Sequence, residues 1–408
     1  MTRLIHVVAQ YRPVIGGAQH YCALLTEALV ERGLDARVLT SRLSDRGTWL
    51  NDLPSEEVID AVRVRRFQAL KRGRVTWRVF HWCRKRHASH PRLLLEMGLM
   101  LAEGPVAPEL PLALLASPRG TLVHLFGVYS ALVGQAFVAA RLARLPIVVT
   151  PFIHTTPPIG LNMLWKRRVL RGADHVIAMT PSEKTYLECE LGLAPSRVSV
   201  VSPGLRPSDY PVLDKPECRR RLGLPDQAFV VLFIGRREPH KGLQTLLAAF
   251  RALRDCCSRT CRLVLVGPVV ANSGGACLQD EADPDVVDLG AADHATKLQA
   301  LNACDCLAFP STSESFGIVI LEAWAVARPV VVTRLPPIED IVADGDDGLL
   351  VDVGSVQQLA AALKRLCDDL PTAATMGERG RLKFLSSYTT ATMADSVLSI
   401  YDSLARVS

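Results

Sequence analysis

The chain has 408 residues, of which 49% are hydrophobic and 22% are charged, and its formal net charge is +6. This length is too great for one ordinary hydrophobic core and predicts two domains of about 200 residues each. The composition excludes a disordered chain, and the leucine-rich stretch at residues 93–116 is too often interrupted to span a membrane.

The first half of the sequence alternates short apolar runs with longer runs of helical periodicity. The predicted strands are residues 4–10, 36–40, 62–67, 122–126, 147–151, 176–179 and 198–201. The predicted helices between them include residues 18–32, 130–144 and 181–191. Because apolar strands that alternate with helices pair in parallel, this half predicts a parallel sheet covered on both faces.

A stretch rich in proline and glycine at residues 203–211 indicates a linker, after which the alternation restarts. The next predicted strands are residues 230–235, 263–267, 286–289, 306–309 and 330–333, and the tail is predicted to be helical over 372–405. We therefore expect two similar domains, residues 1–205 and 206–387, with a helix at about 388–408 that crosses back to the first domain.

Positive charge is concentrated in the segment that begins at Arg63 and ends at Arg92. Residues 61–95 contain eleven Arg or Lys, interleaved with aromatic residues, and no Asp or Glu. This pattern fits either a solvated basic helix or a surface that lies on anionic lipid. No nucleic-acid-binding motif accompanies the charge, so nucleic acid is not an expected partner.

The eleven cysteines are odd in number, and the spacings of Cys256, Cys257 and Cys261 match no zinc or redox pattern. We interpret them as reduced thiols of a cytoplasmic protein, which would lie on the inner membrane face if the basic segment binds lipid. Residues 2–9 are too short and interrupted for a signal peptide and predict the first strand.

Residues 310–329 combine a polar loop with a predicted helix at 316–327. Glu322 is the only charged residue between residues 318 and 327, and burying it unpaired would be costly. The amides at the start of this helix favour a phosphate, and Glu322 lies roughly 9 Å further along it. A ligand with a phosphate and nearby hydroxyls would span this distance. Alternatively, Glu322 pairs with a buried arginine and Glu314 is a solvated loop acid.

Three further segments follow predicted strands, at the end of the sheet where ligands bind. Gly16 and Gly17 either let a phosphate or sugar approach the backbone or form a plain tight turn. Arg236 and Lys241 flank a loop before a helix, where two cations could neutralise a diphosphate. His154 ends another strand, and a lone histidine is more often structural than functional.

Together these segments resemble the retaining, nucleotide-sugar-dependent glycosyltransferases of family 4, or group 1, which have the GT-B fold. The most specific features are the spacing from Gly235 and Arg236 to Lys241 and the two glutamates Glu314 and Glu322 with seven residues between them. The sequence departs from the family pattern at Pro203, where asparagine is usual. It departs again at residues 334–335, where a glycine pair is common, and at residue 327, where glycine is common.

The resemblance implies an α/β protein with two Rossmann-like parallel-sheet domains that face a cleft. It also implies transfer of a sugar, with retention, from a nucleoside-diphosphate sugar to an acceptor hydroxyl. The residues it assigns to the donor are Gly16, Gly17, Arg236, Lys241, Ser315, Phe316, Gly317 and Glu322, and those it assigns to catalysis are His154 and Glu314. No metal or cofactor is implied, since cationic side chains and helix amides can stabilise the leaving diphosphate.

The sequence leaves the base, the sugar and the acceptor open. The acceptor is expected to be a lipid-linked glycan, a cell-surface glycan or a small molecule. The alternatives are a nucleotide-sugar epimerase and a catalytically inactive nucleotide-binding protein of the same fold.

Overall fold

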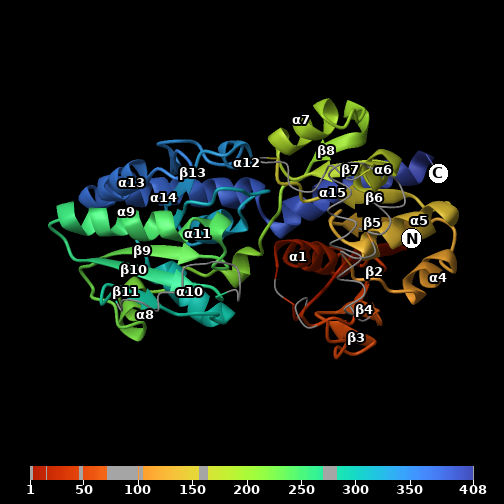
Figure 1. The fold of residues 1–408 in the computed structure, drawn as a ribbon, viewed down its shortest axis with the longest axis horizontal. Coiled ribbons are helices and arrows are strands. Elements are labelled where there is room, and N and C mark those ends of the chain that lie inside the picture. Colours follow the sequence, from red (N-terminus) through yellow and green to blue (C-terminus); the bar gives the residue numbers. More distant parts are fainter. Residues whose placement is uncertain are drawn as a thin grey trace, which may run out of the picture. The chain divides into compact units, whose positions relative to one another are not determined.

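The apolar runs of the sequence form two sheets, one in each of two units of the chain (Figure 1). The computed structural model describes residues 3–14, 16–45, 49–70, 100, 104–155, 164–269 and 283–407. The first unit comprises Met1–His154, Pro158–Gly204 and Thr390–Ser408, and the second comprises Thr155–Pro157 and Leu205–Thr389. The basic segment lies outside the described residues from residue 71 onward.

The first unit contains an eight-stranded sheet in the order β3-β4-β2-β1-β5-β6-β7-β8. Its strands are β1 (Leu4–Val8), β2 (Ala36–Ser41), β3 (Glu56–Ile59), β4 (Val62–Phe67), β5 (Leu122–Phe126), β6 (Ile147–Thr150), β7 (His175–Ala178) and β8 (Val198–Val200). All neighbouring strands are parallel except β3 and β4. The predicted parallel sheet is therefore confirmed, with the antiparallel edge strand β3 added to it.

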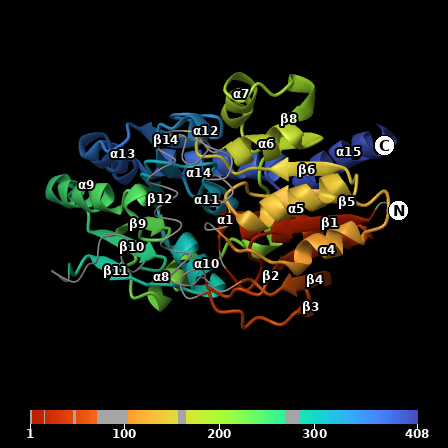
Figure 2. The same cartoon turned by 45° about the vertical axis from the view of Figure 1, so that its right-hand side comes forward.

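Helices cover this first sheet. They are α1 (Gly17–Glu31), α4 (Glu109–Leu115), α5 (Ala131–Leu142), α6 (Leu164–Gly172), α7 (Pro181–Cys189) and α15 (Thr390–Val407). Helix α1 contacts β1 and β2, whereas α5 contacts β1, β5 and β6 and crosses in front of them in Figure 2. The apolar side of α5 and the inner faces of these strands share one buried core, which includes Val7, Leu125 and Leu132.

The second unit contains a six-stranded, fully parallel sheet in the order β11-β10-β9-β12-β13-β14. Its strands are β9 (Phe229–Ile234), β10 (Cys261–Val266), β11 (Val286–Asp288), β12 (Cys306–Phe309), β13 (Val330–Thr333) and β14 (Gly348–Val351). All six residues of β9 are buried, as expected for a strand with helices on both faces. The strand order is that of a Rossmann fold, and it reverses between β9 and β12.

The helices of the second unit lie on both faces of this sheet, with α9 and α13 on one face and α8 and α10 on the other (Figure 1). They are α8 (Lys215–Arg221), α9 (Leu243–Cys256), α10 (His294–Ala303), α11 (Ile318–Ala325), α12 (Pro336–Glu339), α13 (Val356–Asp368) and α14 (Leu370–Ser387). The single tail helix predicted over 372–405 is wrong, because α14 and α15 are separate. The carbonyl of Tyr388 accepts a hydrogen bond from the Leu205 amide at 2.9 Å instead of continuing a helix.

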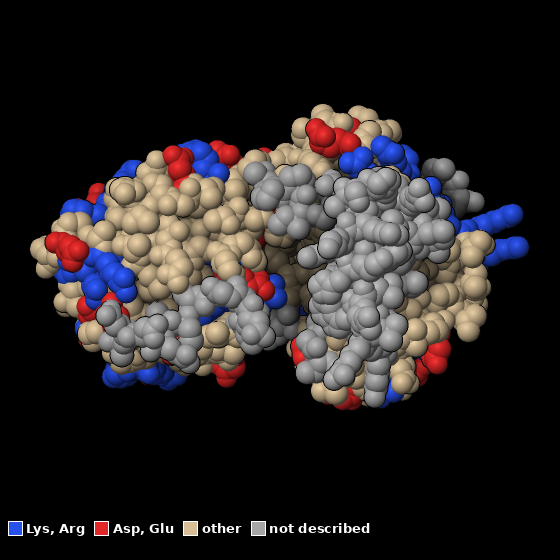
Figure 3. Space-filling view, in the orientation of Figure 1, with Lys and Arg blue, Asp and Glu red and all other residues tan. Residues whose placement is uncertain are grey.

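The described surface mixes charges of both signs on the face shown in Figure 3. Three residues of the basic segment are described with acidic partners: Arg63 pairs with Asp35, Arg65 lies 3.5 Å from Glu56, and Arg66 pairs with Glu57. These three arginines therefore support strand β4 and its neighbours. Among the described residues, no helix combines the length and the apolar character that crossing a bilayer requires.

The last helix is held in the first unit by a buried chain of hydrogen bonds. His6 and His124 are register partners on β1 and β5, and both are fully buried. The hydroxyl of Tyr401 on α15 lies 3.1 Å from Nε2 of His6 and 2.5 Å from Nδ1 of His124. At the far end of the chain, Nε2 of His124 lies 2.8 Å from the hydroxyl of Thr150.

The direction of the protons in this chain follows from its first member. The Thr26 hydroxyl donates to the carbonyl of Cys22 at 2.6 Å, so it accepts from Nδ1 of His6 at 2.7 Å. Burial keeps both histidines neutral. Nε2 of His6 therefore carries no proton and accepts a hydrogen bond from the Tyr401 hydroxyl, whose oxygen accepts one from Nδ1 of His124. Each histidine thus has one tautomer, with its proton on Nδ1.

A second buried titratable group, Glu183, organises the end of strand β6. One carboxylate oxygen of Glu183 accepts from the amide of Ile153 at 2.9 Å and the other from the amide of Met179 at 2.7 Å. Burial raises the pKa of Glu183 to about 7, against the opposing effect of the two amides. The carboxylate thus ties the segment after β6 to the start of α7.

Acid should destabilise the first unit through its two buried histidines. Burial lowers the pKa of His6 to about 3 and lowers that of His124 well below its usual value. An unfolded chain takes up these protons near pH 6.5, whereas the folded unit does not. Each histidine should therefore remove about 2 kcal/mol of stability between pH 7 and pH 5. The two histidines together make the free energy of unfolding depend on pH, and we expect His6→Gln to lose about half of that dependence. Hydrogen exchange of the β1 and β5 amides measures it.

Glu183 changes the stability of the first unit with pH in the opposite direction. Its folded carboxyl holds a proton that the unfolded chain releases above pH 4.5, so it adds about 2 kcal/mol of stability as the pH falls from 7 to 5. Comparing His6→Gln with the wild type at both pH values isolates the histidine effect, because Glu183 is present in both. The matched control is His294→Gln, since His294 is exposed in the second unit. An unchanged pH dependence in His6→Gln would contradict the neutral chain.

Candidate functional site

Two loops of the second unit meet where the strand order reverses. One follows β9 and contains the 3-10 helix Pro239–Lys241, and the other follows β12. Gly242 joins the 3-10 helix to α9 with a φ of 72°, and a Cβ atom there would overlap the carbonyl oxygen of Pro310. The carbonyl of His240 accepts from the Thr312 amide at 2.7 Å and from the Ser311 hydroxyl at 2.9 Å. The two loops are therefore one packed unit.

An ion pair between Lys241 and Glu314 occupies this junction. Their side chains are 16% and 8% exposed, so water screens the pair little. The Ser311 hydroxyl oxygen lies 2.9 Å from the same Glu314 oxygen, and the ammonium of Lys241 lies 5.4 Å from the centre of the Phe309 ring. The structure thus brings together two predicted site residues that lie 73 positions apart in the sequence.

Two consecutive arginines in the first of these loops have different surroundings. Arg236 is 60% exposed and lies 3.2 Å from Glu238. Arg237 is buried and makes a two-pronged pair with Asp288 at the end of β11. Arg236 is therefore accessible to a ligand, whereas Arg237 holds the loop to the sheet. The sequence pattern marked Arg236 and gave no signal for Arg237.

Glu322, on α11, is buried among polar partners. Its Oε1 accepts from the hydroxyl of Tyr210 at 2.9 Å and from Nζ of Lys297 at 2.6 Å. Burial and the neighbouring carboxylate raise the pKa of Tyr210 far above its usual value. Among the described residues, the ion pair of Glu322 is with a lysine of α10, where the alternative had a buried arginine.

Helix α11 begins two residues later than predicted, at Ile318. Gly317 has a φ of 88°, which no helical residue adopts, so it ends the loop and precedes the helix. Phe316, predicted to be the first helical residue, is instead buried against Tyr388, with 6.1 Å between the ring centres. The free amides of the helix start therefore begin at Ile318, while Ser315 lies in the loop and is partly exposed.

The predicted site residues of the first unit follow two of its strands, β1 and β6, which are separated by β5 in the sheet. Gly16 precedes α1 in an extended conformation, and Gly17 opens the helix with free space where a side chain would stand. His154 is half-buried, two residues after Phe152, which has a φ of 57°. The intervening Ile153 amide is the one that Glu183 holds. His154 thus ends a segment whose backbone is fixed from α7.

Three polar residues that support these groups could not be recognised from the sequence. Tyr210 and Lys297 are 112 and 25 positions away from Glu322, and Glu183 is 30 positions away from Ile153. Each lies in an ordinary helical or linker context, so its role follows only from the fold.

Two family models match the chain. The glycosyl transferase 4-like domain matches residues 16–204, and glycosyl transferases group 1 matches residues 214–383, so together they span most of the sequence. The second match contains every predicted site residue of the second unit.

Curated relatives are D-inositol 3-phosphate glycosyltransferases. The protein of Stackebrandtia nassauensis is 34% identical over 260 residues, which are 60% of this chain and 58% of the relative. That of Streptosporangium roseum is 36% identical over 223 residues, 51% and 50% of the two chains. The alignments thus span little more than half the length of these relatives.

Solved structures share the fold over the whole chain. HepE of Anabaena, in complex with UDP and glucose, has a TM-score of 0.71 at 20% identity and covers 99% of this chain and 100% of its own. Sucrose-phosphate synthase of Thermosynechococcus elongatus has a TM-score of 0.71 at 19% identity with complete coverage of both chains. The two Rossmann-like parallel-sheet domains and the similarity to these structures identify the fold as GT-B. The chain belongs to the glycosyl transferases group 1, so the predicted fold class and family are confirmed.

The junction of the two loops should depend on the missing side chain of Gly242. We expect Gly242→Ala to destabilise the second unit for two reasons. The left-handed backbone costs a residue with a side chain about 1 to 2 kcal/mol. In addition, the new methyl group would overlap the Pro310 carbonyl. The control is Gly290→Ala, which has a φ of 58° but open space around it and should show the backbone cost alone. Urea unfolding followed by Trp324 fluorescence compares them. Equal losses would contradict the close approach.

Proposed function

We propose that this protein is a retaining glycosyltransferase that moves a sugar from a nucleoside-diphosphate sugar to an acceptor hydroxyl. The observation that supports this most directly is the junction of Lys241 and Glu314 at the reversal of strand order, with Arg236 exposed on the same loop. Open α/β sheets bind their ligands at this point. The bound UDP and glucose of HepE support the same class of donor.

In this proposal, the diphosphate of the donor binds Arg236 and Lys241. Each charged hydrogen bond to a phosphate contributes on the order of 1.5 to 3 kcal/mol. Lys241 would exchange Glu314 for a phosphate oxygen, which releases the carboxylate to bind hydroxyls of the donor sugar. The ion pair would therefore hold both side chains in place before the donor arrives. The two cations also neutralise the leaving diphosphate, so the reaction does not depend on a metal.

Glu322 is proposed to bind the ribose hydroxyls. Tyr210 and Lys297 both reach its Oε1 and so fix the orientation of the carboxylate. The loop residues Ser315, Phe316 and Gly317 and the first amides of α11 then lie between the ribose and the sugar along the bound donor. A carboxylate has two oxygens, so it can accept hydrogen bonds from both ribose hydroxyls.

We propose that configuration is retained because the departing phosphate, or a same-face ion pair, takes the proton of the acceptor hydroxyl. His154 and the backbone around it are assigned to the donor sugar, and Gly16 and Gly17 to close approach by the ligand. The names of the curated relatives put phosphorylated polyols first among the small acceptors to test. Lipid-linked and cell-surface glycans remain the other proposed acceptors, the former if the basic segment binds anionic lipid.

The experiment that tests the proposal is a thermal-shift screen of UDP-, GDP-, ADP- and TDP-sugars. We expect one base to stabilise the protein clearly more than the others. A radiolabelled donor then tests sugar transfer with and without acceptor. Interconversion of the donor without an acceptor would instead indicate an epimerase, and binding without turnover an inactive carrier.

Lys241 should be required for donor binding through its charge. Lys241→Met removes the cation but leaves Glu314 buried without its partner, which itself costs stability. The double variant Lys241→Met, Glu314→Gln removes both charges, so its fold should be close to wild type. We expect both variants to bind the nucleoside diphosphate 10- to 100-fold more weakly, as loss of one charged hydrogen bond implies, about 1.5 to 3 kcal/mol.

Calorimetric titration with the diphosphate selected by the screen measures this loss. The matched control is Lys364→Met, which removes an exposed lysine of α13 that pairs with Asp368. Affinity within two-fold of wild type in the double variant would rule out the diphosphate contact.

Glu322→Gln should weaken nucleotide binding with little effect on the chemical step. The amide keeps the shape of the side chain but removes the negative charge. It therefore loses the ion pair with Lys297 and one of the two oxygens that can accept hydrogen bonds from hydroxyls. We expect the affinity for the nucleoside diphosphate to fall about ten-fold or more, as for one charged hydrogen bond, while the affinity for inorganic diphosphate changes little. The control is Glu339→Gln, an exposed carboxylate on α12. Unchanged nucleoside diphosphate affinity in Glu322→Gln would refute the ribose assignment.

A further inference from the structure

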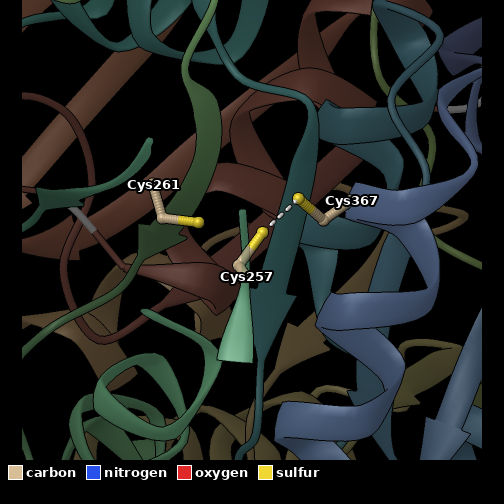
Figure 4. A group of neighbouring side chains, drawn as sticks. All are labelled: Cys257, Cys261 and Cys367. Carbon is tan, nitrogen blue, oxygen red and sulfur yellow. Dashed lines mark hydrogen bonds between the residues drawn. The ribbon is translucent and has the colours of Figure 1, made fainter. Parts of the chain in front are cut away.

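Three cysteines of the second unit bring their sulfur atoms together where the strands of its sheet begin. Cys257 follows the last residue of α9, Cys261 is the first residue of β10, and Cys367 lies in the last turn of α13. Their Sγ atoms all lie within 4.8 Å of one another, and those of Cys257 and Cys367 are 3.0 Å apart (Figure 4). Sequence spacing could not reveal this cluster, because 110 positions separate Cys257 from Cys367.

The cluster is closed on one side and accessible on the other. Cys261 and Cys367 are buried, whereas Cys257 is partly exposed. In Figure 4 the three side chains come from three different elements and point toward a common centre. An ion could therefore enter past Cys257 and meet all three sulfurs without unfolding any of these elements.

The thiols of the cluster also make hydrogen bonds that a cation could replace. The Sγ atoms of Cys257 and Cys367 are close enough for one thiol to donate to the other at 3.0 Å, and the Cys261 thiol donates to the carbonyl of Arg259 at 3.4 Å. A cation bound by these sulfurs would take the place of their protons and release them.

We propose that Cys257, Cys261 and Cys367 form a binding site for a thiophilic d¹⁰ cation, Zn²⁺ or Cu⁺. Three sulfur ligands select these ions over Mg²⁺ or Ca²⁺, which prefer oxygen. A Zn–S distance of about 2.3 Å places the sulfurs roughly 3.8 to 4 Å apart. The Cys257 and Cys367 sulfurs would open by about 1 Å, which side-chain rotation can provide. A disulfide would join only two of the three and leave Cys261 unused.

The site would stabilise the second unit away from the proposed donor site. Cys261 begins β10, whereas Lys241 and Glu314 follow the ends of β9 and β12, so roughly 20 Å of strand separates the two regions. The cation would connect β10 to the helices α9 and α13, which pack on one face of the sheet. Its binding would add to the stability of the folded state, because the unfolded chain does not hold the three sulfurs together.

The test uses the full chain, reduced and freed of metal with a chelator. Titration with Cd²⁺, whose thiolate complexes absorb in the ultraviolet, gives the stoichiometry, and competition by Zn²⁺ and by Cu⁺ gives their affinities. We expect one Cd²⁺ per chain and at least ten-fold weaker binding in Cys257→Ser, Cys261→Ser and Cys367→Ser. Cys257→Ser is the decisive variant, since this residue is partly exposed and its replacement leaves the core packed. Circular dichroism confirms that each variant is folded.

The matched control is Cys256→Ser, since Cys256 is the exposed neighbour of Cys257 and lies outside the cluster. It should bind Cd²⁺ as the wild type does, and Zn²⁺ should raise the unfolding temperature of both but not of Cys257→Ser. Absence of stoichiometric binding, or binding that survives Cys257→Ser, would overturn the proposal. So would a chain that forms a Cys257–Cys367 disulfide in air and takes up no Cd²⁺ when reduced.

Discussion

The close approach of two backbones at Gly242 and Pro310 determines the geometry of the candidate site. The strand order places β9 beside β12, so the loops after them start as neighbours. They can pack against each other only because residue 242 has no side chain and takes a left-handed conformation. Once they are packed, Lys241 faces Glu314 at the junction. The position of these charges therefore follows from the backbone and not from mutual attraction of two flexible side chains.

Charge in this unit is buried in pairs, and the pairs differ in what surrounds them. Arg237 and Asp288 form a two-pronged pair that holds a loop to the sheet edge. Lys241 with Glu314 and Lys297 with Glu322 instead lie beside the loop and helix that face the carboxyl ends of the strands. Burying an ion pair seldom adds net stability compared with apolar groups. The proposed donor would account for both pairs: its diphosphate would exchange for Glu314 at Lys241, and Glu322, oriented by Lys297, would bind its ribose.

Much of the fold could be predicted from the sequence because apolar runs in a doubly covered sheet are nearly continuous. The bounds of β4, β5, β12 and β13 agree with the predicted ones residue for residue. Strand β3 was missed because it is an edge strand with the sequence Glu-Glu-Val-Ile and alternating exposure. The start of α11 was misplaced because the sequence does not show that Gly317 is left-handed.

The candidate site was predictable only where a motif is local. Lys241, Glu314 and Glu322 could be selected from short segments with a loop beside a helix. Their partners could not, since Tyr210 and Lys297 come from a linker and from another helix, and nothing in their own segments distinguishes them. The same limit applies to the three clustered cysteines, whose third member lies in α13.

Tyr401, which completes the buried hydrogen bonds of the first unit, is synthesised near the end of the described chain, and this affects the order of folding. The first unit is complete only when α15 has joined β1 and β5, yet α15 is the last helix of the described chain to leave the ribosome. All described strands of the second unit emerge before it. During translation, His6 and His124 therefore lack their shared partner while the second sheet can already form, and the first unit is the later of the two to be completed.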